Sequence, residues 1–238
     1  MAILKELDDG TEFVKAKYYE GETLKGYWKV YRKVDGVRVM RNAANEPVSR
    51  AGKPLYNVNH LEFKDAEVYS INWNTSVSLV RSQTPQIVTQ DMIYELTDGN
   101  IDPRLLMGTV LHPDDLKLKG LMQLRLDQGD EGLILRQLHK SGKFYVWLKV
   151  VPKKQADVRI TGFKEGAGRL KGTLGSIQTK HGSVGSGFDD ELRDQLWTDR
   201  TSLMGTIIQV EYREVTEAGK LRFPAFVRQR FDKTEESI

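Results

Sequence analysis

The sequence predicts an α+β protein in which a larger mixed part precedes a small all-β barrel. Two observations predict this organisation. Short β-rich runs bounded by Gly, Asn, Asp or Pro dominate the chain, and helical patterning is sparser. After the segment "WLKVVPKK" the texture changes to closely spaced short strands around one helix. With 238 residues, of which 39% are hydrophobic, the chain is long enough for two modest domains with cores of their own.

In the larger part, five runs have the composition of strands and are bounded by turn-forming residues. These runs are 26–34, 36–42, 66–73, 131–138 and 143–151. Apolar residues near helical spacing predict helices over 76–84 and 102–129. Pro113 is a break or a first-turn residue of the second helix.

In the C-terminal part, short strands alternate with turn signals. We expect these strands in 158–180, 205–215 and 221–231. The segment 189–203 begins with acids and has one apolar face, which predicts a helix. Short strands around one helix suit a small barrel of the OB type. Pro152 and the charge pair after it predict a short hinge, so we expect domains of 1–153 and 154–238.

The composition excludes several classes of function. The chain has no cysteine, so disulfides, thiolate-bound zinc and a cysteine nucleophile are excluded. Its apolar runs are too short to span a bilayer, and its N-terminus does not resemble a secretory signal. We therefore expect a cytoplasmic protein, in the host cytoplasm if it is viral, with no membrane partner.

The net charge of +3 is too small to indicate a nucleic-acid partner by itself, but its distribution is informative. Residues 159–182 are rich in glycine and hold five basic residues against one acid. Such a segment can bring its backbone close to a phosphate chain. A set of solvated hairpin turns explains it equally well at this level.

The stretch "KVDGVR" at 33–38 has two interpretations. Asp35-Gly36 has the chemistry of a tight turn, so the segment could be a hairpin with solvated charges. Alternatively, Lys33 is a nucleophile. The short motif cannot decide between them, so the rest of the chain has to supply the context.

Further motifs supply that context. They are Ser49-Arg50-Ala51-Gly52-Lys53, Asp65-Ala66-Glu67, Ile93-Tyr94-Glu95, "EGLILR" at 131–136, Trp147-Leu148-Lys149 and Arg230-Phe231-Asp232-Lys233. With the Lys33 motif, this succession resembles the motif order of small two-domain ATP-dependent DNA ligases of the phage type, in the covalent nucleotidyltransferase superfamily. The resemblance implies a nucleotidyltransferase (adenylation) domain of antiparallel sheets with flanking helices, followed by an OB-fold domain.

The resemblance also implies an activity: ATP-dependent sealing of 5′-phosphate/3′-hydroxyl nicks in duplex DNA, with Mg²⁺ as cofactor. The Lys33 amine would attack the α-phosphorus of ATP and hold AMP as a phosphoramidate, before AMP passes to the DNA 5′ end. A free lysine titrates near 10.4, so neighbouring cations and a metal must favour the neutral amine. The partners implied are ATP and nicked duplex DNA. No protein partner is implied, and we expect a monomer.

Individual roles follow from the same resemblance. Lys33 would be the catalytic nucleophile. Nucleotide binding would fall to Arg38, Glu67, Tyr94, Lys149, Arg230 and Lys233, and metal binding to Glu131 and Glu67. DNA contacts would fall to Ser49, Arg50, Arg38, Lys164, Arg169 and Lys171. Within the nucleotide set, Tyr94 would stack on adenine, and Arg230 and Lys233 would orient the leaving pyrophosphate when the OB domain closes.

Two positions depart from the family pattern. Val151 stands where the family has a second lysine, so Lys153 or Lys154 would have to replace it. Ala66 replaces a glycine, which is tolerable only if the backbone there does not need a positive φ.

Other functions remain open at the level of the sequence. RNA ligases and mRNA-capping guanylyltransferases share the lysine chemistry, and a non-catalytic OB-type nucleic-acid binder is an alternative of a different class. The C-terminal segments "VGSGFDDELRDQLW" and "FPAFVRQRFDK" favour a DNA ligase. The residues Lys33, Glu67, Glu131 and Lys149 argue against a decayed pocket.

Overall fold

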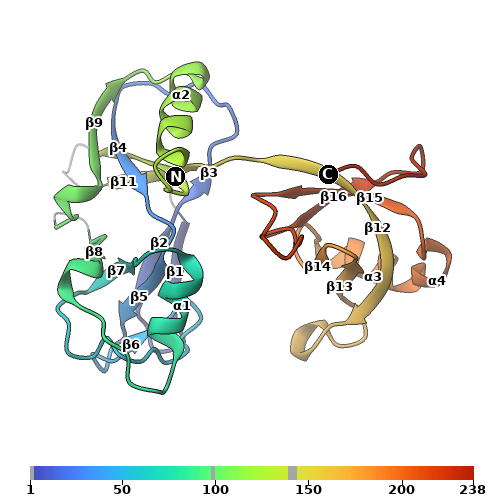
Figure 1. The fold of residues 1–238 in the computed structure, drawn as a ribbon, viewed down its shortest axis with the longest axis horizontal. Coiled ribbons are helices and arrows are strands. Elements are labelled where there is room, and N and C mark those ends of the chain that lie inside the picture. Colours follow the sequence, from blue (N-terminus) through green and yellow to red (C-terminus); the bar gives the residue numbers. More distant parts are fainter. Residues whose placement is uncertain (1–2, 98–99, 139–143) are drawn as a thin grey trace. The chain divides into compact units, whose positions relative to one another are not determined.

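The computed structural model describes residues 3–97, 100–138 and 144–238, and the chain divides into two compact units (Figure 1). The first unit is Met1–Val151 and the second is Pro152–Ile238. The first unit combines several β-sheets with helices, and the second is built on one antiparallel sheet. The predicted α+β class is confirmed.

The larger sheet of the first unit has the strand order β3-β11-β10-β4-β9. Its strands are β3 (Lys17–Tyr18), β4 (Tyr27–Lys33), β9 (Leu106–Leu111), β10 (Gly132–Leu138) and β11 (Phe144–Val150). Neighbouring strands are antiparallel except β3 and β11, which run parallel. Helix α2 (Asp115–Leu126) packs on one face of this sheet, where its Leu118 is fully buried against Val30 and Leu133.

A second sheet of the first unit has the order β6-β5-β7-β8. Its strands are β5 (Val37–Arg41), β6 (Pro47–Val48), β7 (Asp65–Val68) and β8 (Ile93–Glu95), the last preceded by a 3₁₀ turn, η1 (Gln90–Met92). Helix α1 (Trp73–Arg81) covers it, and Val39, Val68 and Val80 are fully buried between them. A separate hairpin of β1 (Ile3–Glu6) and β2 (Glu12–Lys15) precedes both sheets.

The second unit has the strand order β14-β13-β12-β15-β16. Its elements are β12 (Lys154–Glu165), η3 (Gly168–Leu170), β13 (Leu174–Thr179), β14 (Gly182–Val184), α3 (Asp190–Thr198), α4 (Arg200–Leu203), β15 (Ile207–Tyr212) and β16 (Ala225–Gln229). Within this unit, all of which is described, no continuous ladder closes the sheet into a barrel. A single parallel bridge between Ser186 and Ala225 joins its two edges.

Two predicted elements are wrong in part. In the run 102–129 only α2 is α-helical, because Leu106–Leu111 pairs with β4 as strand β9 after a 3₁₀ turn, η2 (Pro103–Leu105). The predicted strand 66–73 ends at Val68, because the Asn72 side chain caps α1 by accepting a hydrogen bond from the Thr75 amide (2.9 Å). In both cases tertiary pairing or a cap overrides the local pattern.

None of the helices that the structure describes is long and apolar enough to cross a membrane.

Candidate active site

Two strand ends bring Lys33 and Glu131 together. Lys33 is the last residue of β4, and Glu131 immediately precedes β10. The Glu131 amide donates to the Lys33 carbonyl oxygen (2.7 Å), and the Lys33 ammonium forms an ion pair with the Glu131 carboxylate. Their side chains are only 22% and 9% exposed. The predicted nucleophile and the predicted metal ligand are therefore direct partners.

Gly36 in the Lys33 motif and Gly132 in the Glu131 motif lie where the chain passes close to the backbone of another strand. A Cβ on Gly36 would clash with the Val68 carbonyl oxygen and with Glu67 Cγ, and one on Gly132 would clash with the Val150 carbonyl oxygen. Strands β4 and β5, which flank Asp35-Gly36, belong to different sheets. The hairpin interpretation of this segment is therefore wrong, and Gly36 instead lets the chain after Lys33 pass tightly against β7.

Three predicted site residues form a row across the smaller sheet. Arg38 on β5 lies opposite Glu67 on β7, which lies opposite Tyr94 on β8. Residues directly opposite each other share one face of a sheet. Burial raises the pKa of the Glu67 carboxyl, and the nearby positive charges of Lys33, Arg38 and Arg50 act in the other direction. The Lys33 amine, on the larger sheet, is thus close to the Glu67 carboxylate on the smaller sheet.

Arg38 is held by Asp65, a residue that was not predicted to belong to the site. Its Nε donates to Asp65 Oδ1 (2.7 Å), a second contact joins its Nη2 to Asp65 Oδ2, and Nη1 donates to the Val14 carbonyl oxygen (2.7 Å). In this structure the guanidinium is therefore engaged within the protein. The signal was in the sequence, because Asp65 opens the Asp65-Ala66-Glu67 motif.

Tyr94 lies in a cluster of apolar side chains between the sheets, with Tyr31, Leu105 and Ile134. The Arg104 guanidinium covers one side of its ring, with Cζ 4.3 Å from the ring centroid. Arg104 is itself fixed by Asp102 and by two backbone carbonyls. A stacked base would therefore have to use the opposite side of the Tyr94 ring.

Lys149 is placed by the parallel pairing of β3 with β11, which sets Tyr18 opposite it. The Lys149 ammonium lies 3.7 Å from the centroid of the Tyr18 ring. Burial lowers the pKa of Lys149, and the positive charges of Lys33 and Lys15 lower it further, against the opposing effect of Tyr18. Tyr18 could not be found from the sequence, because the two-residue parallel strand β3 leaves no periodic pattern, and no motif pointed to Lys15 in β2.

The two departures from the family pattern have different outcomes. Ala66 is fully buried within strand β7, an extended conformation that alanine adopts freely. Val151 is buried, so its side chain takes no part in a charged site. Lys153 and Lys154 belong to the second unit, and their substitution for the missing lysine stays a prediction.

Ser49 and Arg50 lie in a turn after β6. The Ser49 hydroxyl accepts hydrogen bonds from the Ala51 and Lys53 amides (3.4 and 3.2 Å), so it shapes this turn.

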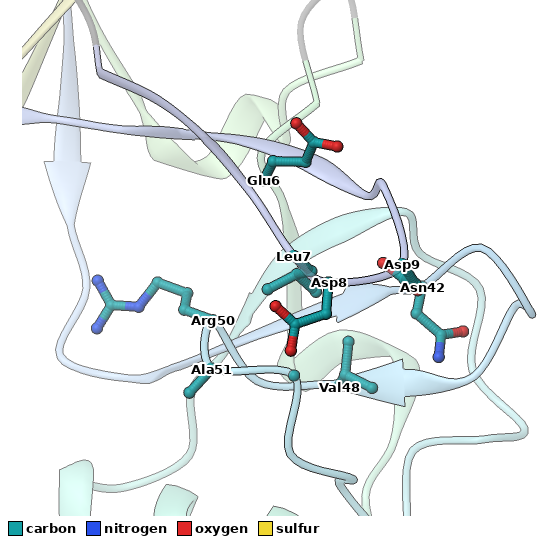
Figure 2. A pocket seen from close by; sticks show the side chains of 9 residues that line it. Glu6, Leu7, Asp8, Asp9, Asn42, Val48, Arg50 and Ala51 are labelled. Atoms are coloured by element: carbon teal, nitrogen blue, oxygen red, sulfur yellow. The ribbon is translucent and has the colours of Figure 1, made fainter. Parts of the chain in front are cut away.

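The turn and the acidic loop of the N-terminal hairpin line a hollow of about 380 Å³ (Figure 2). Figure 2 shows the Arg50 guanidinium directed away from Asp9 and Asn42. Neither Lys33 nor Glu131 lines this hollow, so it is not the candidate active site.

In the second unit, Arg230 is held by two acids. It donates to Asp157 Oδ1 (3.0 Å) and forms a paired contact with Asp232 (2.9 and 2.8 Å). The Asp157 side chain is 8% exposed, and the Lys233 ammonium lies 3.8 Å from it. The motif Arg230-Phe231-Asp232-Lys233 is thus one connected set of charges around a buried aspartate that the sequence did not single out.

The three basic residues predicted for DNA in the second unit fall on one connection. Lys164 is near the end of β12, Arg169 lies in η3 and Lys171 follows it, and all three are exposed. Arg169 also donates to Asp190 at the start of α3 (2.7 Å). An exposed pair of this kind is weak and leaves the arginine available.

The acidic residues near Lys33 suit Mg²⁺ only in combination with a bound phosphate. Among residues 3–97, 100–138 and 144–238, no group of three or more acidic or histidine side chains gathers as a ready-made metal site. Mg²⁺ commonly takes only one or two carboxylates from a protein, together with phosphate oxygens and water. Glu131 and Glu67, both close to Lys33, fit that requirement once a triphosphate is bound.

The raised pKa of Glu67 predicts a dependence of stability on pH. The Glu67 carboxyl keeps its proton to a higher pH in the folded state than in the unfolded chain, where its pKa is about 4.5. The free energy of unfolding therefore falls as the pH rises from 4.5 through the raised pKa of the folded state. We expect Glu67→Gln, which stays uncharged, to have a higher melting temperature than the wild type at pH 7.5 and a similar one near pH 4. Thermal unfolding at both values tests this. The exposed acid Glu62, changed to Gln, serves as the control. An unchanged or lower melting temperature of Glu67→Gln at pH 7.5 would contradict the prediction.

The first unit, in which Lys33 pairs with Glu131, is thus followed by a unit built on one five-stranded sheet. Residues 165–230 match the family model described as "DNA ligase OB-like domain". The second unit is therefore of that kind, and the resemblance to small ATP-dependent DNA ligases is confirmed at the level of the fold.

Solved structures agree. Two solved structures described as "Pmar-Lig_PreS3" and "Pmar-Lig_Pre." match with TM-scores of 0.61 and 0.63 at 22% identity, over 87% of this chain. This chain spans 64% of the length of each. A third structure, titled "DNA binding with a minimal scaffold: Structure-function analysis of Lig E DNA ligases", matches with a TM-score of 0.59 at 20% identity, over 96% of this chain and 100% of its own. No curated protein sequence matches the chain.

Proposed function

We propose that the protein is an ATP-dependent DNA ligase that seals nicks in duplex DNA through a covalent lysyl-AMP intermediate. The observation that carries the proposal is the direct pair of Lys33 and Glu131 at the ends of β4 and β10, in a chain that also has a DNA ligase OB-like domain. Neither feature alone would select this function, because the lysine chemistry is shared by RNA ligases and capping enzymes.

In the first step, the Lys33 amine gives up a proton and attacks the α-phosphorus of ATP. A nitrogen–phosphorus bond forms, and the bond from that phosphorus to the pyrophosphate oxygen breaks. Lys149 lies within electrostatic range of Lys33. Its positive charge opposes the effect of Glu131, which stabilises the ammonium form of Lys33, and it can contact the α-phosphate. Bound Mg²⁺, held by Glu131 and Glu67, would neutralise phosphate charge.

The remaining groups bind and orient. Tyr94 offers one side of its ring to adenine, and Glu67 faces the ribose. AMP then passes to the 5′-phosphate of the nick, and the 3′-hydroxyl displaces it. Ser49, Arg50, Lys164, Arg169 and Lys171 would contact the DNA backbone. Arg38 would join the nucleotide or the DNA after release from Asp65, and Arg230 and Lys233 would orient the leaving pyrophosphate.

The proposal is tested by incubation with ATP labelled on the α-phosphate, followed by nick sealing. We expect a covalent adduct that requires a divalent cation, and sealing of a nicked DNA duplex in preference to nicked RNA or hybrid duplexes. Preference for an RNA nick would indicate an RNA ligase, and an adduct with GTP in place of ATP a capping enzyme. Absence of any adduct would indicate a nucleic-acid binder without this activity.

A further prediction concerns Tyr18. A cation–π contact contributes about 0.5 to 2 kcal/mol, so its loss should slow adenylylation roughly two- to thirtyfold. We expect Tyr18→Leu to show this loss, because the Lys149 ammonium loses the ring beneath it. Tyr18→Phe keeps the ring and should stay closer to the wild-type rate. Single-turnover rates of AMP transfer to the protein measure the effect, and equal rates for Tyr18→Leu and the wild type would refute it.

A further inference from the structure

A second cluster of ion pairs lies directly behind the Lys33–Glu131 pair. Arg32 precedes Lys33 in β4, and Asp130 precedes Glu131. Because successive residues of a strand point to opposite faces, Arg32 lies on the face of the sheet that packs against α2, whereas Lys33 lies on the other. The site is therefore joined to a charged cluster on the reverse side of the same two strands.

The contacts within this cluster are close and buried. Arg32 binds Asp130 in a bidentate manner, from Nε to Oδ2 (3.0 Å) and from Nη2 to Oδ1 (2.9 Å). Arg125, in the last turn of α2, donates from Nε to the same Oδ2 (2.5 Å). The Asp130 side chain is 2% exposed. A buried carboxylate needs such compensation, and here two arginines supply it.

We propose that the Arg32–Asp130 pair is a positioning device that sets the Lys33 amine against Glu131. This inference rests on the proposed function. The ladder between β4 and β10 ends at Lys33 and Gly132, so the Lys33 and Glu131 side chains lie where the pairing of the two strands ends. Arg32 and Asp130 tie those strand ends together from the reverse side. A displacement of about 1 Å at a reacting group can cost roughly a hundredfold in rate.

The two arginines have separable roles. Arg125 compensates the buried charge and fastens Asp130 to α2, and the Asp130 amide also donates to the Arg125 carbonyl oxygen (3.0 Å). Among the described residues, Arg32 is the one whose side chain connects this carboxylate to β4, the strand that carries Lys33. The bidentate contact fixes both the distance and the relative orientation of the Arg32 guanidinium and the Asp130 carboxylate.

This separation gives a matched pair of variants. Arg32→Gln and Arg125→Gln each remove one arginine from the same carboxylate and leave the other in place. We expect Arg32→Gln to lower the maximal rate of self-adenylylation roughly ten- to a hundredfold, with little change in the ATP concentration at half-maximal rate. Arg125→Gln should lose clearly less, and Arg32→Lys should recover part of the rate. Asp115→Asn, which removes the exposed pair with Lys119, should behave as the wild type.

Sealing of a nick that already carries 5′-AMP does not use the Lys33 amine. This step therefore distinguishes a loss of Lys33 positioning from general damage to the folded protein. Arg32→Gln should retain this step. If Arg32→Gln loses the sealing step as strongly as adenylylation, the pair is merely structural and the inference is wrong. Equal adenylylation rates for Arg32→Gln and Arg125→Gln, with a normal adduct in the wild type, would also overturn it. Absence of an adduct in the wild type would instead overturn the proposed function.

Discussion

Lys33→Ala is expected to abolish the covalent AMP adduct completely while leaving the protein able to seal a nick that already carries AMP on its 5′ end. The attack on ATP needs the amine as a nucleophile, whereas the attack of the 3′-hydroxyl on adenylylated DNA does not. Adduct formation with labelled ATP and sealing of a pre-adenylylated nick measure the two steps separately. Uptake of labelled AMP by the variant would exclude Lys33 as the nucleophile.

Lys33→Arg is the matched control for this experiment. It keeps a positive charge opposite Glu131, so the buried carboxylate retains a partner. A guanidinium stays protonated and cannot serve as the nucleophile. We therefore expect no adduct from Lys33→Arg, with a melting temperature closer to the wild type than that of Lys33→Ala. An adduct in the arginine variant would place the nucleophile elsewhere.

Arg230→Ala is expected to have the second largest effect, lowering the rate of adenylylation without DNA by roughly a hundred- to a thousandfold. The physical reason is the loss of a fixed positive charge for the leaving pyrophosphate. The change also leaves the buried Asp157 carboxylate with Lys233 as its remaining charged partner, so the second unit should melt at a lower temperature. Single-turnover adenylylation below that temperature measures the effect.

Arg169→Gln is the control in the same unit. Arg169 also pairs with an aspartate, but the pair is exposed and the residue is assigned to DNA. The variant Arg169→Gln should leave the rate of adenylylation unchanged and weaken nick sealing, most clearly at higher salt. A wild-type adenylylation rate in Arg230→Ala would count against a role in pyrophosphate release.

The strands that carry motifs could be predicted from the sequence, because their residues have two signals at once. The segments that became β4, β5, β10 and β11 have β-rich composition, and turn-forming residues separate most of them. The N-terminal hairpin and β3 had no comparable signal, since β3 has only two residues and pairs with a strand far along the chain. Strand β9 was mistaken for helix because its apolar residues also fit helical spacing.

The candidate site could be predicted as a set of residues but not as a set of contacts. The motifs name Lys33, Glu131 and Lys149, yet they do not show that Lys33 pairs with Glu131 or that Tyr18 lies beneath Lys149. Partners such as Asp65 and Asp130 sit beside motif residues, and only the register of the sheets shows what they hold. Side-chain pairing across sheets depends on tertiary structure, which no local pattern specifies.

The parallel contact of β3 with β11 has a consequence for the order of events during protein synthesis. The larger sheet pairs residues 17–18 with 148–149, so it cannot be completed until translation has passed Lys149. Until then, the apolar face that Leu118 covers lacks β11. The second unit is more local, since β12, β13 and β14 pair as a meander. We expect nascent chains stalled before residue 144 to be digested readily by protease, and chains long enough to expose Val151 outside the ribosome to resist it.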